Sequence, residues 1–232
     1  MKAYRQPKVV NQPGLFSKPL SIGTTMGILA LACLLVSFTP TYSFSQTKTI
    51  IDEWANVQAP KPPELKPVTM DPKVTALLVL DIVKQVCNAE RRPRCVDSVP
   101  RIQGLVNQAR AKGVPVIYSV SSSAGPADIW KEVAPLDGDP IVKASADKFF
   151  KTDLEKILSD KGIKTVIVVG SAAEGAVLNT ASQAAFRGLQ VIVPVDGMSS
   201  GNTYFEQYTV YHLANAPGVG QRVTLTKIDM IK

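Results

Sequence analysis

The stretch TVIVVGSAAEGAVLNTASQAAFRG, residues 165–188, decides the fold that we expect for this chain. Its first part, 165–170, is apolar and rich in valine and isoleucine, a composition typical of a strand that is covered on both faces. Its second part, 174–188, has helical periodicity and ends at a glycine, which commonly follows the last turn of a helix. The stretch therefore predicts a buried strand, a tight turn of small residues and a helix.

The same alternation recurs along most of the chain. Apolar runs that predict further strands lie at 74–81, 114–121, 190–196 and 222–231, and helical patterns lie at 98–113, 152–162 and 202–215. Strands that alternate with helices are typical of a parallel sheet with helices on both faces. We therefore predict one doubly wound α/β domain at 74–232, with three layers and a mostly parallel six-stranded sheet.

The first 45 residues have the order of a secretory signal peptide. Four basic residues and no acids precede an apolar run at 26–38, and a small, polar segment follows it. We expect cleavage near Ser45, and hence export to the periplasm or the extracellular space. Two alternatives remain: an uncleaved membrane anchor formed by residues 22–38, which just reach the length of a span, and lipidation at Cys33.

Residues 46–73 separate this segment from the domain. They are rich in proline and lysine and lack an apolar period, which predicts an extended linker or a strap laid over the domain; a solvated tether is the alternative. Removal of residues 1–45 takes away four positive charges and no negative ones, so the formal net charge falls from +7 to +3. A charge of this size, without a stripe of basic residues, gives no indication of nucleic-acid binding.

Cysteine usage agrees with an oxidising compartment. Of the three cysteines, Cys33 lies in the targeting segment, while Cys87 and Cys95 bracket the polar sequence NAERRPR. We expect Cys87 and Cys95 to form a disulfide. The alternative is a free, reactive Cys87 thiol whose pKa is lowered by the neighbouring arginines.

Ligands of such folds bind at the carboxyl ends of the strands, so the residues that follow the strands are the candidates for chemistry. Asp81 directly follows five apolar residues, where burial raises the pKa of a carboxyl and suits it to proton transfer; a turn or capping role is the alternative. Lys143 follows a short apolar segment, and at the same edge it would hold Asp81 ionised or stabilise an anion; a solvated surface position is the alternative. We expect the nearby Lys148 and Lys151 to be solvent-exposed.

The turn after residue 170 carries only small residues before a helix that begins near Glu174. The free N–H groups of such a helix start make a site for an oxyanion or a carboxylate; tight packing of strand against helix is the alternative. His212 is the only histidine, and we expect it to pack within an aromatic helical stretch. With a single histidine and none of the common cofactor-binding motifs, the sequence predicts no metal site, no histidine-based triad and no cofactor.

Three segments together resemble the isochorismatase-like superfamily, which includes cysteine hydrolases such as nicotinamidases and carbamoyl amidohydrolases. TALLVLD resembles the family's first strand, and its catalytic aspartate falls on Asp81. IVKASADKFFKTDLEKIL resembles the family's lysine segment and places the catalytic lysine on Lys143. Residues 162–200 resemble the strand, turn and helix that carry the cysteine nucleophile. The resemblance covers about 74–231.

Three departures from the family pattern bear on the chemistry. The family cysteine falls on Ala176, the threonine three residues earlier falls on Ala173, and the usual glutamine two residues after the aspartate falls on Val83. A thioester mechanism therefore cannot operate at Ala176, which has no nucleophile.

True isochorismatases also lack the thiol. The resemblance to them implies that Asp81 acts as a general acid, that Lys143 supplies positive charge and that water attacks the substrate. The oxyanion donors that remain are the backbone N–H groups of Ala172, Ala173 and Ala176. The resemblance also implies a cis peptide in this turn, which we expect between Ala172 and Ala173.

Two functional hypotheses follow. The first is an exported, thiol-independent hydrolase of a small molecule, and the second is a ligand-binding protein that retains the pocket without catalysis. A third, weaker hypothesis uses Cys87 as a displaced nucleophile. The resemblance further implies association into homo-oligomers, and we expect membrane contact only through the N-terminal segment.

Overall fold

The computed structural model describes residues 47–232, so the predictions for residues 1–45 lie outside the described residues. The chain divides after Asn56 into two units, which are described separately. The second unit, from Val57 to Lys232, is an α/β domain. Among residues 47–232, no helix combines the length and the apolar character that crossing a bilayer requires.

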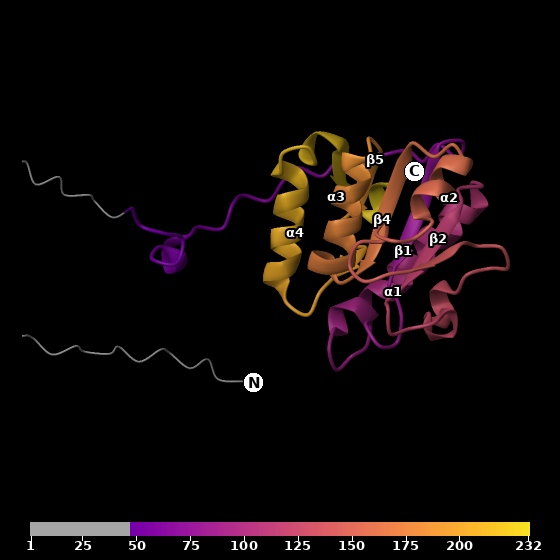
Figure 1. The fold of residues 1–232 in the computed structure, drawn as a ribbon, viewed down its shortest axis with the longest axis horizontal. Coiled ribbons are helices and arrows are strands. Elements are labelled where there is room, and N and C mark those ends of the chain that lie inside the picture. The colour runs from indigo at the N-terminus through magenta and orange to yellow at the C-terminus, as the bar shows by residue number, and fades with distance from the viewer. Residues whose placement is uncertain (1–46) are drawn as a thin grey trace, which may run out of the picture. The chain divides into compact units, whose positions relative to one another are not determined.

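The domain is built around a parallel sheet (Figure 1). Its strand order is β3-β2-β1-β4-β5-β7, and all of these neighbours pair in parallel. The strands are β1 (Thr75–Leu80), β2 (Val116–Val120), β3 (Ile141–Lys143), β4 (Thr165–Ser171), β5 (Gln190–Pro194) and β7 (Val223–Thr226). The prediction of a doubly wound, mostly parallel α/β fold is confirmed.

A seventh strand extends the six that the sequence predicts. β6 (Met198–Ser199) has two residues and pairs with the end of β4, beyond the part of β4 that pairs with β5. Its register sets Met198 beside Gly170 and Ser199 beside Ser171. A pair of residues is too short to show an apolar period, so sequence reasoning could not detect β6.

Helices cover both faces of the sheet. The helices are α1 (Pro93–Ala111), α2 (Leu154–Asp160), α3 (Leu178–Phe186) and α4 (Thr203–Asn215). Alternate residues of β1 enter two separate cores: Leu78 packs in the cluster of α2, α3 and α4, and Leu77 in the cluster of α1. This double burial explains why β1 is apolar at every position, since each buried aliphatic side chain contributes about 1.5–3 kcal/mol.

The helix boundaries differ from the prediction mainly at α1. It begins at Pro93 instead of residue 98, because proline is favoured at the first position of a helix, where its missing N–H leaves no unpaired donor. α4 begins as the sequence suggests, with the Asn202 side chain accepting a hydrogen bond of 2.8 Å from the Tyr204 N–H.

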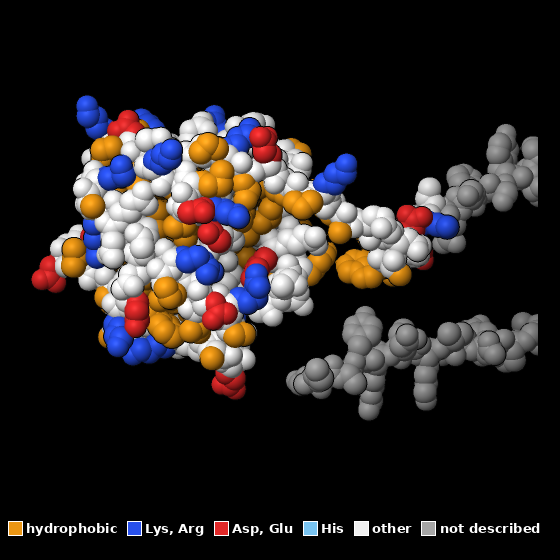
Figure 2. Space-filling view, turned by 180° about the vertical axis from the view of Figure 1, so that it is seen from behind, with side chains coloured by type: hydrophobic (Ala, Val, Ile, Leu, Met, Phe, Trp, Pro, Cys, Tyr) orange, Lys and Arg blue, Asp and Glu red, His pale blue; other side chains and the backbone are white. Residues whose placement is uncertain are grey.

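The segment that enters the domain runs along the C-terminal end of the chain. The N–H of Lys66 donates to the Leu225 carbonyl at 2.9 Å, and Val68 forms a parallel bridge with Ile231. On the face shown in Figure 2, Lys and Arg side chains are interspersed with Asp and Glu side chains.

Candidate functional site

Asp81 lies directly after β1, at the carboxyl edge of the sheet. The residue is 5% exposed, and its backbone has φ of 52°, in the left-handed region. The Ser119 hydroxyl, at the end of β2, donates to Asp81 Oδ1 at 2.7 Å, and the Asp81 N–H donates to the Ser119 carbonyl at 3.2 Å. Two neighbouring strands therefore fix the orientation of the carboxyl group.

The charge partner of Asp81 is Lys148. Lys148 Nζ donates to Asp81 Oδ2 at 2.7 Å, and the lysine side chain is fully buried. The same ammonium also donates to the carbonyls of Ala144, at 3.0 Å, and Ser145. With three acceptors around it, the buried ammonium is fully hydrogen-bonded, as a buried charge requires.

The expected Asp81–Lys143 pair is therefore wrong, and so is the expectation that Lys148 faces solvent. Lys143 ends β3, the edge strand of the sheet, and its side chain is exposed. The loop after β3 turns back toward β1 and carries Lys148 inward. Lys151 is exposed as expected. The one signal for Lys148 in the sequence is its position directly before Phe149, which is also buried.

Burial raises the pKa of the Asp81 carboxyl above its ordinary value, and the ion pair with Lys148 and the hydrogen bond from Ser119 oppose part of that rise. A raised pKa keeps a larger fraction of a carboxyl group protonated at a given pH, and only the protonated form can act as a general acid. The pair therefore has the electrostatic character of a general acid beside a fixed positive charge.

The turn after β4 lies next to Asp81. The carboxyl ends of β1 and β4 approach so closely that a Cβ added to Gly170 would lie 2.0 Å from the Leu80 carbonyl oxygen. The Ser171–Ala172 peptide is cis, one position before the expected Ala172–Ala173 bond. A short π-helical turn, η4 (Ala173–Val177), follows and leads into α3.

The Ala172 carbonyl holds this turn closed by accepting hydrogen bonds from the N–H groups of Gly175, at 3.1 Å, and Val177, at 3.2 Å. Ala173 and Ala176, at the positions of the family threonine and cysteine, are buried. Ala176 lies one turn before Thr180, whose hydroxyl accepts a 3.2 Å hydrogen bond from the Lys148 N–H. At the positions of the family threonine and cysteine, this turn therefore offers only methyl groups and backbone.

The loop before β3 packs over the segment that follows Asp81. Val83 is fully buried and bridges Ile129, and the Trp130 N–H donates to the Ile82 carbonyl at 3.0 Å. A valine at this position therefore serves packing, where an amide would require a hydrogen-bond partner.

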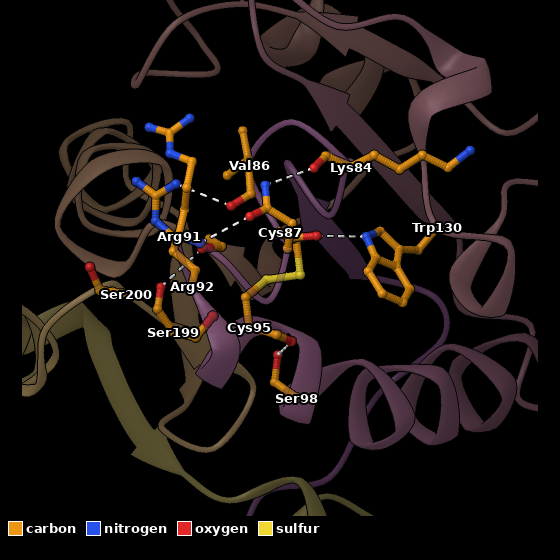
Figure 3. The surroundings of a disulfide bond; sticks show 12 residues. Lys84, Val86, Cys87, Arg91, Arg92, Cys95, Ser98, Trp130, Ser199 and Ser200 are labelled. Carbon is orange, nitrogen blue, oxygen red and sulfur yellow. Dashed lines mark hydrogen bonds between the residues drawn. A yellow bond between two sulfur atoms is a disulfide. The ribbon is translucent and has the colours of Figure 1, made fainter.

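A disulfide ties this segment to α1, as Figure 3 shows. Cys87 and Cys95 are joined and both are fully buried, so the predicted pairing is confirmed and the free, nucleophilic Cys87 thiol is wrong. The indole of Trp130 donates to the Cys87 carbonyl at 2.9 Å from one side of the loop. Arg91 and Arg92 lie on the other side and donate to the carbonyls of residues 85 and 86.

A chain of polar contacts connects η4 to two helices. The Ser200 hydroxyl donates to Glu174 at 2.6 Å, and the Ser200 N–H donates to Glu206 of α4 at 2.9 Å. Arg94 of α1 binds both oxygens of Glu206, at 2.8 and 2.5 Å. Sequence reasoning missed this chain, because no local pattern connects residues so far apart.

A pocket of about 290 Å³ is lined in part by two residues of these polar contacts, Arg94 and Glu206. Its walls include Pro60–Pro63, Met198 and Tyr211, together with Arg94 and Glu206. Asp81 and Lys148 do not line it, so this pocket is separate from the ion pair. Its size is near the lower end of ligand pockets.

No group of three or more His, Cys, Asp or Glu side chains in residues 47–232 is arranged to hold a metal ion. His212 lies on α4, with its ring centroid 5.9 Å from that of Tyr208.

Comparisons with known proteins agree with this fold. A model of the isochorismatase domain matches residues 75–226. The chain is 30% identical over 148 residues to the N-carbamoylsarcosine amidase of Arthrobacter sp, a match that covers 52% of this chain and 56% of the amidase. It is 29% identical over 144 residues to the secreted isochorismatase effector Isc1 of Verticillium dahliae, covering 57% of this chain and 76% of the effector. The chain thus spans little more than half the length of the amidase.

Solved structures share the fold. A cysteine hydrolase from Pseudomonas syringae pv. phaseolicola 1448A superposes with a TM-score of 0.61 at 21% identity, covering 72% of this chain and 94% of that chain. An isochorismatase from Pseudomonas putida KT2440 gives a TM-score of 0.62 at 17% identity, covering 71% of this chain and 93% of that chain. At these identities the likeness concerns the fold alone.

Proposed function

Because this chain belongs to the isochorismatase family, we propose that it hydrolyses a small molecule without a cysteine nucleophile, and that Asp81 and Lys148 are the reacting pair. The observation that carries the proposal is the 2.7 Å ion pair between two buried side chains at the carboxyl edge of a parallel sheet. A buried ion pair adds little net stability over an apolar pair, so stability alone does not account for it.

The proposed reaction uses Asp81 as the proton carrier. Protonated Asp81 donates its proton to the leaving group while water attacks the electrophilic carbon, and the proton that the water releases returns to Asp81. Lys148 and the Ser119 hydroxyl stabilise the Asp81 carboxylate, which forms the ion pair with Lys148 before it takes up a proton and after it gives one away. Negative charge that develops on the substrate is placed toward the backbone N–H groups of Ala172, Ala173 and Ala176, which side-chain substitutions do not remove.

The second candidate is a small-ligand-binding protein without catalysis. The methyl groups at Ala173 and Ala176 and the packed Val83 favour it, because all three lack the polar groups of the cysteine hydrolases. Retention of a fully hydrogen-bonded Asp81–Lys148 pair favours the hydrolase.

We also propose that the protein is exported. The buried Cys87–Cys95 disulfide is typical of proteins from oxidising compartments. The basic and apolar order of residues 1–45 and the similarity to a secreted effector support the same compartment.

A substrate panel tests the proposal. The protein is incubated with amides, carbamates and enol ethers, alongside Asp81→Asn, Lys148→Met and Ala176→Cys. Lys143→Met serves as the matched control, since it removes a lysine from the same segment but from an exposed position.

Turnover that disappears in Asp81→Asn and Lys148→Met and persists in Lys143→Met supports the hydrolase. Turnover unchanged in Asp81→Asn overturns it. A silent wild type in which Ala176→Cys creates amidase activity identifies the second candidate, a pocket that has lost its nucleophile.

A further inference from the structure

The pocket beside Arg94 and Glu206 is formed by the lead-in segment 60–63, by α4 and by residues at the ends of β5 and β6. Its volume of about 290 Å³ is near the lower end of ligand pockets, so it admits a molecule of about the size of one substituted ring. None of the residues proposed for catalysis lines it. A ligand in this pocket would therefore be bound apart from the reacting pair.

Apolar side chains form most of the wall. The lead-in contributes proline rings and the domain contributes aliphatic side chains: Pro60, Pro62, Pro63, Val195, Met198 and Val210. Proline has no N–H, so this part of the wall brings few donors that a ligand would have to satisfy. Tyr211, which is 47% exposed, adds an aromatic ring. Aromatic rings pack well against one another in offset or edge-on contact, so the wall favours a ligand with a flat, apolar body.

The lead-in is attached to the domain directly after the pocket. Leu65 packs against the core cluster of α2, α3 and α4. The Lys66 N–H donates to the Leu225 carbonyl of β7 at 2.9 Å. The wall at 60–63 therefore ends at a point that is fixed on the sheet.

The charged residues of the wall carry one positive charge in excess. They are Lys61, Arg94 and Glu206. The Glu206 carboxylate is already compensated, because Arg94 binds both of its oxygens and the Ser200 N–H donates to it at 2.9 Å. Among residues 47–232, no carboxylate forms an ion pair with Lys61. The charge that remains for a ligand is therefore the Lys61 ammonium.

We propose that this pocket binds a small organic anion with a flat, apolar body, of the class of single-ring carboxylates. The ring lies against the prolines of the lead-in and the side chains of Val210 and Tyr211. The carboxylate of the ligand accepts from Lys61 and from the Nη1 donors of Arg94, since Glu206 takes up only the Nε and Nη2 donors of this guanidinium. The proposal is independent of the hydrolase reaction, because Asp81 and Lys148 take no part in it.

Benzoate is the probe for this pocket. Protein labelled with ¹³C in its methionine methyl groups is titrated with sodium benzoate at low salt, and the Met198 signal is identified by its loss in Met198→Leu. Met70, which is buried in the separate core cluster of α1, is the internal reference. We expect the Met198 signal to shift in a saturable way, with a dissociation constant of about 1 mM for a ligand of this size, and the Met70 signal to stay in place.

Two lysine variants test the charge contact. Lys61→Met is expected to weaken benzoate binding by about threefold to fivefold, the size expected of an ion pair at an exposed position. Lys66→Met is the matched control, because Lys66 is exposed on the same segment but does not line the pocket. It should leave binding unchanged. Benzamide, which is neutral, and benzylamine, which is a cation, are expected to bind more weakly than benzoate.

A Met198 signal that does not move at benzoate concentrations far above the expected dissociation constant overturns the proposal. Equal shifts of the Met198 and Met70 signals also overturn it, because they show an effect that is not localised to the pocket. Binding of benzamide or benzylamine as tight as that of benzoate overturns the anionic class of ligand. Equal weakening in Lys61→Met and Lys66→Met overturns the contact with Lys61.

Discussion

Lys143 and Lys148 lie on one short segment and have opposite environments. Lys143 ends the edge strand β3, where one side of the strand has no neighbour and the side chain reaches water. Lys148 follows a loop that closes over the carboxyl edge, and its ammonium is enclosed by Asp81 and two backbone carbonyls. The comparison teaches that position relative to the central strands, and not spacing along the chain, selects the lysine that meets the carboxylate.

The largest effect is expected when the buried lysine is removed. Lys148→Met leaves Asp81 buried without its counter-charge, which should lower the free energy of unfolding by about 3–5 kcal/mol at neutral pH. Loss of the ammonium raises the folded pKa of Asp81 further above its unfolded value, so the variant should recover stability as the pH falls. Urea denaturation across pH measures both effects. Lys143→Met, an exposed substitution, should change stability by less than about 0.5 kcal/mol; equal losses in the two variants would contradict the comparison.

The second effect concerns the segment after Asp81, which is held covalently. Cys87→Ala with Cys95→Ala removes the disulfide and should cost about 2–4 kcal/mol of stability. Thermal unfolding of the variant and of the reduced wild type measures this loss. Similar melting temperatures for the variant and the oxidised wild type would show that packing by Val83 and Trp130 is sufficient.

A smaller effect is expected where the Lys148 loop contacts α3. Thr180→Val removes the acceptor for the buried Lys148 N–H and should lower stability by about 1–3 kcal/mol, the usual cost of an unsatisfied buried donor. Val is nearly isosteric with Thr, so the change in packing is small. Thr209→Val is the matched control, because the Thr209 hydroxyl is buried and has no hydrogen-bond partner. The control should be neutral or stabilising, and a loss as large as that of Thr180→Val would refute this role for the contact.

The smallest effect is a shift in the pH dependence of activity. The Ser119 hydroxyl stabilises the ionised form of Asp81, so Ser119→Ala should raise the pKa of this carboxyl. A general acid works below its pKa, and the alkaline limb of the rate profile should therefore move to higher pH in the variant. Initial rates measured across pH with any substrate from the panel test this; a limb that stays in place or moves to lower pH would exclude Asp81 as the proton donor.

Most elements of the fold could be predicted, because the apolar runs of strands and the periodicity of helices are both local patterns in the sequence. The apolar runs at β1 and β4 and the helical period of α4 depend only on neighbouring residues. The runs at β1 and β4 are continuous because these strands are buried on both faces. β6 and the early start of α1 were missed, since a two-residue strand and a proline-led helix start carry no period.

The candidate site was predicted in part for the same reason. Asp81 was found because it directly follows a buried strand, and the cysteine pair because the two thiols lie close together in the sequence. Lys148 and the chain from Glu174 to Arg94 were missed, because their partners come from other strands and helices.

The sequence by itself determined the alternation of strands and helices, the place of the carboxylate and the absence of a thiol at residue 176, all of which are properties of short segments. Only the tertiary structure decided which lysine neutralises Asp81 and which side chains seal its surroundings. The physical reason is that a buried charge must find its partners across the fold, where the distance in space is unrelated to the distance along the chain.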